Sequence, residues 1–150
     1  MEAPIYLDHN ATTPLLPAVV EAMLPFLREH FGNPSSSHVY GRRARDAVER
    51  ARAQVAELVG ATPAEIVFTS GGTEANNLAI RGATAASTRR RIVTSLIEHP
   101  ATDRPCRLLE RQGWEVFRAT VGSTGQVRVD DVEHGLGDDP ALVTVMHANN

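Results

Sequence analysis

The chain has 150 residues, of which 42% are hydrophobic and 22% are charged, and these proportions are typical of a globular protein with one core. Its formal net charge of −3 gives no electrostatic reason to expect nucleic acid or an anionic membrane as a partner. A single cysteine excludes an internal disulfide, and no apolar run approaches the roughly 18 residues of a membrane span. We therefore expect a soluble, cytoplasmic protein.

One helix and one loop are expected in the first 41 residues. Ile5–Asp8 is a short extended run that leads into a polar turn. Pro17 suits the first position of a helix with one apolar face, which Pro25 is expected to kink or interrupt and Gly32-Asn33-Pro34 to end. The polar segment from Gly32 to Gly41 is typical of a binding loop, but equally of a mobile connector.

A long helix follows. From Arg42 the apolar residues share one face while Arg and Glu residues occupy the other, and Gly60 closes the helix. The segment Thr62-Pro63-Ala64-Glu65 then matches a capping box, so we expect one further helical turn.

The central stretch EIVFTSGGTEANNLAI, from Glu65 to Ile80, has the pattern of a strand, a tight turn and a helix. Ile66–Phe68 is short and β-prone, Ser70-Gly71-Gly72 breaks it, and a helical pattern starts near Thr73. A helix that begins there leaves backbone N–H groups unpaired, and these suit a phosphate or another anion.

The same stretch taken alone is also typical of a plain connection between a strand and a helix. It lacks the G-x-G-x-x-G spacing of a dinucleotide site. It also lacks the lysine of a P-loop, and the chain contains no lysine at all, since its 15 basic residues are all arginine.

Alternating strands and helices are expected in the remainder. Strands are predicted at 92–95, 114–117 and 141–146, a short edge strand at 126–129, a helix through Cys106 that ends at Gly113, and a brief helix capped by Asp130. This order predicts an α/β fold with a mainly parallel sheet and helices on both faces. Ligands bind such sheets at the carboxyl ends of the strands, where the 70–73 turn, His99 and Asn149-Asn150 are expected.

These residues resemble a known family, the cysteine desulfurases, which are pyridoxal-phosphate enzymes of the aminotransferase class V type. The likeness covers nearly the whole chain and rests on five motifs in the family's order. They are YLDHNATTP at 6–14, FGNPSSSH at 31–38, EIVFTSGGTEANNLAI at 65–80, EHPA at 98–101 and MHANN at 146–150.

The resemblance implies the N-terminal part of a fold type I transferase large domain at 16–150, with 1–15 belonging to a small domain, in a homodimer. Such enzymes transfer sulfur from L-cysteine to an acceptor or scaffold protein for iron–sulfur clusters, and release L-alanine. Gly72 and Thr73 correspond to the contacts of the cofactor phosphate, and Asn150 to the partner of its phenolic oxygen. His99 corresponds to the residue that stacks on the cofactor ring and assists proton transfer. No metal site is implied.

Two departures from the family limit the activity that can be expected. The relatives hold the cofactor covalently through a lysine, which this chain lacks, and Cys106 does not match their catalytic cysteine. We therefore expect an N-terminal fragment without desulfurase activity of its own. A different class V enzyme, such as a selenocysteine lyase, and a non-catalytic remnant that pairs with a full-length partner remain alternatives.

Overall fold

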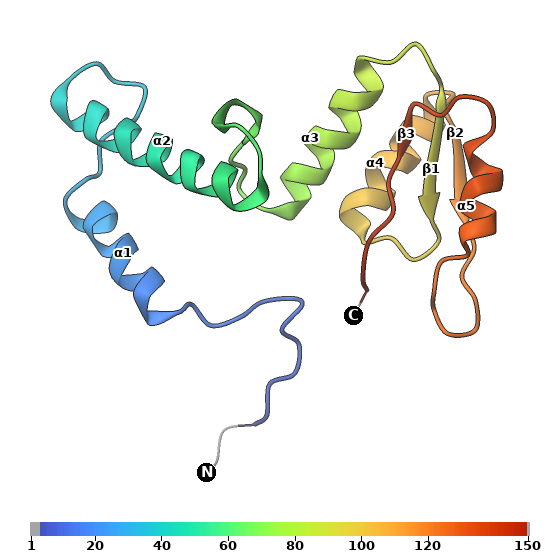
Figure 1. Cartoon of the computed structure of the whole chain (residues 1–150), viewed down its shortest axis with the longest axis horizontal. Helices are drawn as coiled ribbons and strands as arrows, with labels where there is room; N and C mark the ends of the chain where they lie inside the picture. Colours follow the sequence, from blue (N-terminus) through green and yellow to red (C-terminus); the bar gives the residue numbers. More distant parts are fainter. Residues whose placement is uncertain (1–3, 150) are drawn as a thin grey trace. The chain divides into compact units, whose positions relative to one another are not determined.

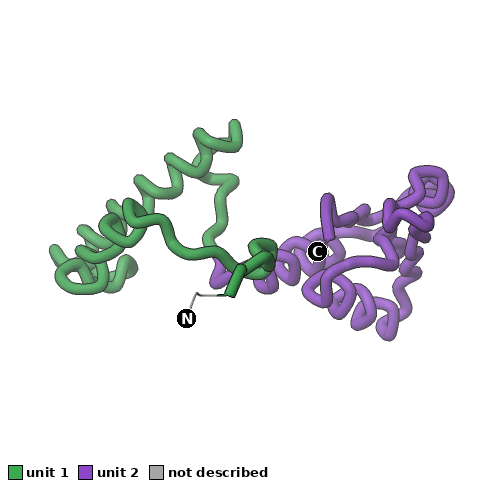
Figure 2. The backbone as a smooth tube through the Cα atoms, turned by 90° about the horizontal axis from the view of Figure 1, so that it is seen from below, with its two compact units in different colours: residues 1–68 green, residues 69–150 purple. Residues whose placement is uncertain are grey.

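The computed structural model describes residues 4–149. The chain forms two compact units, of which the first ends at Phe68 and the second begins at Thr69 (Figures 1 and 2). The first unit contains α1 (Pro17–Arg28), α2 (Val39–Val59) and the 3-10 turn η1 (Pro63–Glu65). The second contains α3 (Gly72–Ala85), β1 (Arg91–Ser95), α4 (Pro100–Arg111), β2 (Glu115–Ala119), α5 (Val129–Leu136) and β3 (Leu142–Val143). No helix in the described residues is long and apolar enough to cross a membrane.

The helices of the first unit are set by local signals. Helix α2 begins earlier than the apolar stripe predicted, because the His38 side chain accepts a hydrogen bond from the Gly41 N–H and caps it. It ends as predicted at Gly60, which has a left-handed backbone (φ 68°). The capping box of η1 is also confirmed, since Glu65 accepts a hydrogen bond from the Thr62 N–H at 2.7 Å.

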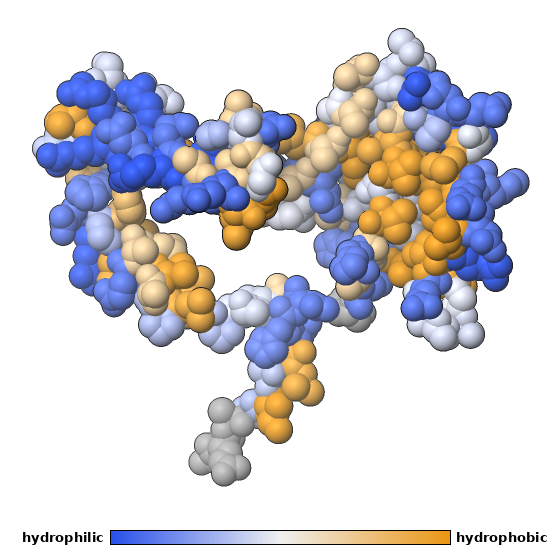
Figure 3. Space-filling view, viewed as in Figure 1, coloured by the Kyte–Doolittle hydropathy of each residue, from blue (hydrophilic) through white to orange (hydrophobic). Residues whose placement is uncertain are grey.

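Pro25 does not interrupt the first helix, which was one of the two effects predicted for it. Helix α1 continues through Pro25 to Arg28 and ends before Gly32, and the Pro25 carbonyl accepts hydrogen bonds from the N–H groups of Glu29 and His30. Every residue of α1 is at least partly exposed, and Figure 3 shows hydrophobic side chains at the surface of this helix.

The strand predicted at Ile66–Phe68 is not formed. No strand among residues 4–149 pairs with this segment, and Val67 is 65% exposed. Instead, the Arg52 guanidinium donates to the Ile66 carbonyl and lies 5.1 Å from the Phe68 ring centroid. A β-prone sequence becomes a strand only where a second strand satisfies its backbone groups, and here a side chain from α2 takes one of them.

The second unit contains the predicted parallel sheet, with the strand order β2-β1-β3. Ile92 is opposite Val116 on one side and opposite Leu142 on the other. The last strand is shorter than predicted, although hydrogen bonds from Ala141 N to Arg91 O and from Thr144 N to Val93 O extend the pairing beyond it. The central strand β1 therefore fixes both of its neighbours.

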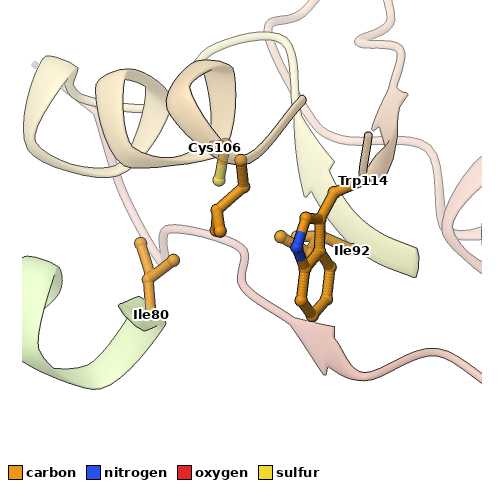
Figure 4. Packing of buried hydrophobic residues seen from close by; sticks show 5 residues of the cluster. Ile80, Ile92, Cys106 and Trp114 are labelled. Carbon is orange, nitrogen blue, oxygen red and sulfur yellow. The ribbon is translucent and has the colours of Figure 1, made fainter. Parts of the chain in front are cut away.

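Helices cover both faces of this sheet, as the alternation of elements predicted. Helices α3 and α4 pack on one face around Ile80, Ile92, Cys106, Leu109 and Trp114, four of which are labelled in Figure 4. Helix α5 packs on the other face, where the Phe117 ring lies 5.9 Å from that of His134. Cys106 is fully buried and packs there as a small apolar side chain.

The edge strand predicted at 126–129 is wrong. Only an isolated antiparallel bridge joins Val121 and Val127 there, and α5 already begins at Val129. Asp130 is not the cap of this helix, because Arg128 occupies that position without a side-chain hydrogen bond. The Asp131 carboxylate instead binds the N–H of Thr120 at 3.1 Å, which anchors the start of α5 to the chain after β2.

Candidate functional site

His99 stands at the carboxyl edge of the sheet, after β1 and immediately before α4. Its ring caps that helix, because Nδ1 accepts a hydrogen bond of 3.1 Å from the Ala101 N–H. The neutral tautomer that can accept at Nδ1 carries its proton at Nε2. The exposed imidazole is thus held in one orientation with a single donor available.

The turn before α3 leaves backbone donors available at the start of that helix. Within residues 4–149, the N–H groups of Gly72 and Thr73 have no hydrogen-bond partner. A Cβ atom added at Gly71 or Gly72 would meet no other atom within 4 Å, so the space around the turn is open. Unpaired N–H groups and the helix dipole together favour an anion here.

The turn itself is held by Glu74. Its carboxylate accepts a hydrogen bond of 2.6 Å from the Ser70 N–H. Hydrogen bonds from the hydroxyl and the N–H of Ser70 lower the pKa of Glu74, so the carboxylate is ionised at neutral pH. Glu74 therefore satisfies one of the loop donors and leaves those of Gly72 and Thr73 exposed.

A cavity of about 450 Å³ brings the two halves of the site together. Thr73 and Asn77 of α3 line it from one side, and His99 and Arg104 line it from the other. Helices α3 and α4 are joined by a hydrogen bond of 3.1 Å from Asn76 Nδ2 to Thr102 Oγ1. Thr73 and His99 are far apart in sequence, and the packing of α3 on α4 places both on one cavity.

The segment after β3 approaches the same edge of the sheet. The Glu98 carboxylate accepts hydrogen bonds from the Ser95 hydroxyl at 2.7 Å and from the Met146 N–H at 2.8 Å. Asn149 Nδ2 donates to the Ile97 carbonyl at 3.1 Å. Asn150, predicted to contact the cofactor, lies outside the described residues.

A family model decides the relationship of this chain to known proteins. The model described as aminotransferase class-V matches residues 5–150. The chain belongs to this family. The resemblance to cysteine desulfurases is also confirmed, because curated relatives with that name match nearly the whole chain.

Relatives within the class V family are longer than this chain. It is 51% identical to the cysteine desulfurase IscS of Dictyoglomus turgidum over all of its own length and 39% of that protein. It is 51% identical to a cysteine desulfurase of Nostoc sp. over 97% of its length and 37% of the relative. The chain thus spans about two fifths of the length of the curated relatives it matches.

Solved structures of class V relatives share the fold. A NifS-like protein superposes with a TM-score of 0.90 at 38% identity, over 97% of this chain and 40% of the other. SspA in complex with cysteine superposes with a TM-score of 0.85 at 36% identity, over 96% of this chain and 42% of the other. These matches confirm an α/β fold of the kind that the motifs implied.

The residues of the site fit the phosphate of pyridoxal phosphate, the cofactor of this family. Two unpaired N–H groups, the Thr73 hydroxyl and open space at Gly72 form a donor set suited to a dianion. A covalent link does not fit, because the chain has no lysine to supply it. No group of His, Cys, Asp and Glu that could hold a metal occurs in the described part of the chain.

Three residues at this edge of the sheet were not singled out by the sequence pattern, namely Glu98, Asn77 and Arg104. Glu98 lies in the EHPA motif beside His99, so its position gave a usable signal. Asn77 and Arg104 gave none, because the cavity that they line exists only after α3 and α4 have packed together.

Proposed function

We propose that the chain supplies the phosphate-binding and ring-facing part of a pyridoxal-phosphate-dependent cysteine desulfurase. The observation that carries the proposal is the single cavity shared by Thr73, at the donor-rich start of α3, and His99, at the start of α4. The names of the relatives and the cysteine bound to SspA support L-cysteine as the substrate.

In this role Gly72 and Thr73 would bind the phosphate through their N–H groups and the Thr73 hydroxyl, and His99 would lie against the ring. Asn150 would donate to the phenolic oxygen. The bound cofactor supplies an electron sink that weakens the bonds to hydrogen and sulfur in the amino acid. With Nδ1 held by the Ala101 N–H, His99 exchanges protons only through Nε2.

The complete enzyme in this proposal is a cytoplasmic homodimer. It passes sulfur as a persulfide to an acceptor or scaffold protein for iron–sulfur cluster assembly, and it releases L-alanine. The 150 residues by themselves are expected to bind the cofactor without turning over L-cysteine, because they contain no lysine.

The same absence of lysine supports a second candidate, a non-catalytic chain that pairs with a lysine-bearing subunit. Co-purification with a full-length class V subunit would favour it. A chain that remains a stable monomer in the presence of such a subunit would rule it out.

Titration with pyridoxal phosphate tests the main proposal. In ¹H–¹⁵N spectra at pH 7, we expect saturable shifts of the Gly72 and Thr73 amides and of the His99 ring. Pyridoxal, which lacks the phosphate, should bind at least about tenfold more weakly, since it cannot use the charge-assisted hydrogen bonds. Equal affinity for the two compounds, or shifts that avoid the start of α3, would overturn the proposal. Release of L-alanine from L-cysteine by the purified chain would overturn the expected inactivity.

A further inference from the structure

A second cavity, of about 350 Å³, lies at the opposite edge of the sheet from His99. Arg81 of α3 and Arg90, just before β1, line it together with Gln112 and Trp114, which follow α4. Since β1 runs from Arg91 to Ser95, Arg90 is at its amino end and His99 lies beyond its carboxyl end. This cavity is therefore separate from the proposed cofactor site.

The charges in this cavity are of one sign. Among the described residues, neither guanidinium has an ion-pair or hydrogen-bond partner, whereas the adjacent Arg89 and Arg91 are paired with Asp139 and Glu115. No carboxylate lines the cavity. Two cations left without a counter-charge around one hollow favour an anionic ligand.

The Trp114 side chain also lines this cavity. The residue is only 6% exposed, and its indole N–H has no hydrogen-bond partner within residues 4–149. Because Thr94 Oγ1 is the fully enclosed side-chain polar atom without a partner in the described chain, the indole N–H keeps some contact with solvent. The ring therefore forms a mostly buried aromatic wall beside the two arginines.

One of the two arginines is already held in place. The Arg90 guanidinium lies 5.1 Å from the centroid of the Trp114 ring, in a cation–π contact. The Ser87 hydroxyl accepts from the Arg89 N–H at 3.1 Å and keeps its own hydrogen free to donate. A stacked guanidinium loses less conformational freedom when it binds a ligand, so the donors are partly preorganised.

From these contacts we infer that the cavity between Arg81, Arg90 and Trp114 is a binding site for a small oxyanion, either a phosphate or a carboxylate group. The two guanidinium groups supply the charge and the donors, and the indole ring forms one wall of the cavity and holds Arg90. A volume of about 350 Å³ admits a group of this size rather than a folded partner.

The single tryptophan of the chain gives this inference a direct reporter. Inorganic phosphate and citrate are titrated separately at pH 7 and constant ionic strength, and the Trp114 indole cross-peak is followed in ¹H–¹⁵N spectra. We expect saturable shifts with at least one probe, and the probe with the higher affinity identifies the anion class. Arg81→Gln and Arg90→Gln should each weaken binding about fivefold or more, as loss of a charge-assisted contact does.

Arg50→Gln is the matched control, because it removes the same charge from an exposed position of α2. It should leave the affinity unchanged. Gly72→Pro, at the proposed cofactor site, should also leave the Trp114 response unchanged, so failure at one site is distinguishable from failure at the other. A linear shift that sodium chloride reproduces, or arginine variants that bind like the Arg50 control, would overturn the inference.

Discussion

The Glu98 carboxylate accepts a hydrogen bond of 2.8 Å from the backbone N–H of Met146, which lies 48 residues further along the chain. The same oxygen, Oε1, accepts from the Ser95 hydroxyl at 2.7 Å. One side chain thus ties the carboxyl end of β1 to the segment that follows β3. This tie holds the strand that leads to His99 beside the segment that leads to Asn149.

Removal of this tie should loosen the segment after β3. Glu98→Ala deletes the acceptor and leaves the Met146 N–H unpaired, which should cost about 1–3 kcal/mol of unfolding free energy. Glu98→Gln keeps a carbonyl oxygen in place and should retain most of the stability. Hydrogen exchange at the Met146 amide measures the effect locally, and equal protection in wild type and Glu98→Ala would contradict the role of this carboxylate.

The role of the α3 backbone can be tested at Gly72. Gly72→Pro removes the Gly72 N–H and adds a pyrrolidine ring, which is well tolerated at the first position of a helix. We expect the helix to remain and the affinity for pyridoxal phosphate to fall about tenfold, since one charge-assisted donor is lost. Gly72→Ala is the control, because it keeps the N–H and its Cβ has free space. Indistinguishable affinities of the two variants would remove Gly72 from the phosphate site.

The buried hydroxyl of Thr94 should be dispensable for stability. The residue is 1% exposed, and its Oγ1 has no hydrogen-bond partner among the described residues. Thr94→Val keeps the shape and removes the unsatisfied group, so the unfolding free energy should rise by about 1 kcal/mol.

Thr84 provides the opposite case in the same unit. It is also buried, but its Oγ1 donates to the Ile80 carbonyl at 2.8 Å. Thr84→Val should therefore lower the unfolding free energy or leave it unchanged. Urea unfolding of both variants checks the pair, and a larger loss from Thr94→Val than from Thr84→Val would show that the Thr94 hydroxyl has a stabilising role.

The Cys106 thiol should make stability depend on pH in the alkaline range. Burial raises the pKa of Cys106 to about 11, and the positive charge of Arg118 offsets only part of this rise. An exposed thiol in the unfolded chain loses its proton near pH 8.5. Between about pH 8.5 and 11 the unfolded state binds fewer protons than the folded state, so the unfolding free energy falls as pH rises.

Urea unfolding at pH 8 and pH 10 measures this dependence. Cys106→Ala should lose the part of the slope that the thiol contributes, although the variant will be less stable at both pH values because it leaves a cavity. The same slope in both proteins would show that another group is responsible.

Those elements whose signals lie within a few residues of one another could be predicted from the amino-acid pattern alone. The apolar periodicity of α2, the left-handed glycine at Gly60 and the capping box at Thr62 act locally, and each was predicted correctly. The five motifs in order were also sufficient to identify the class V family, because a motif records residue types at fixed spacing.

Long-range packing, which no local pattern displays, sets which extended segments pair and which side chains meet. Ile66–Phe68 has the composition of a strand but no partner among the described residues, whereas β3 pairs with β1 over just Leu142–Val143 and the hydrogen bonds beside it. The cavity shared by Thr73 and His99 likewise depends on the packing of α3 against α4. Contacts between residues far apart in sequence depend on the whole fold, and no local pattern specifies them.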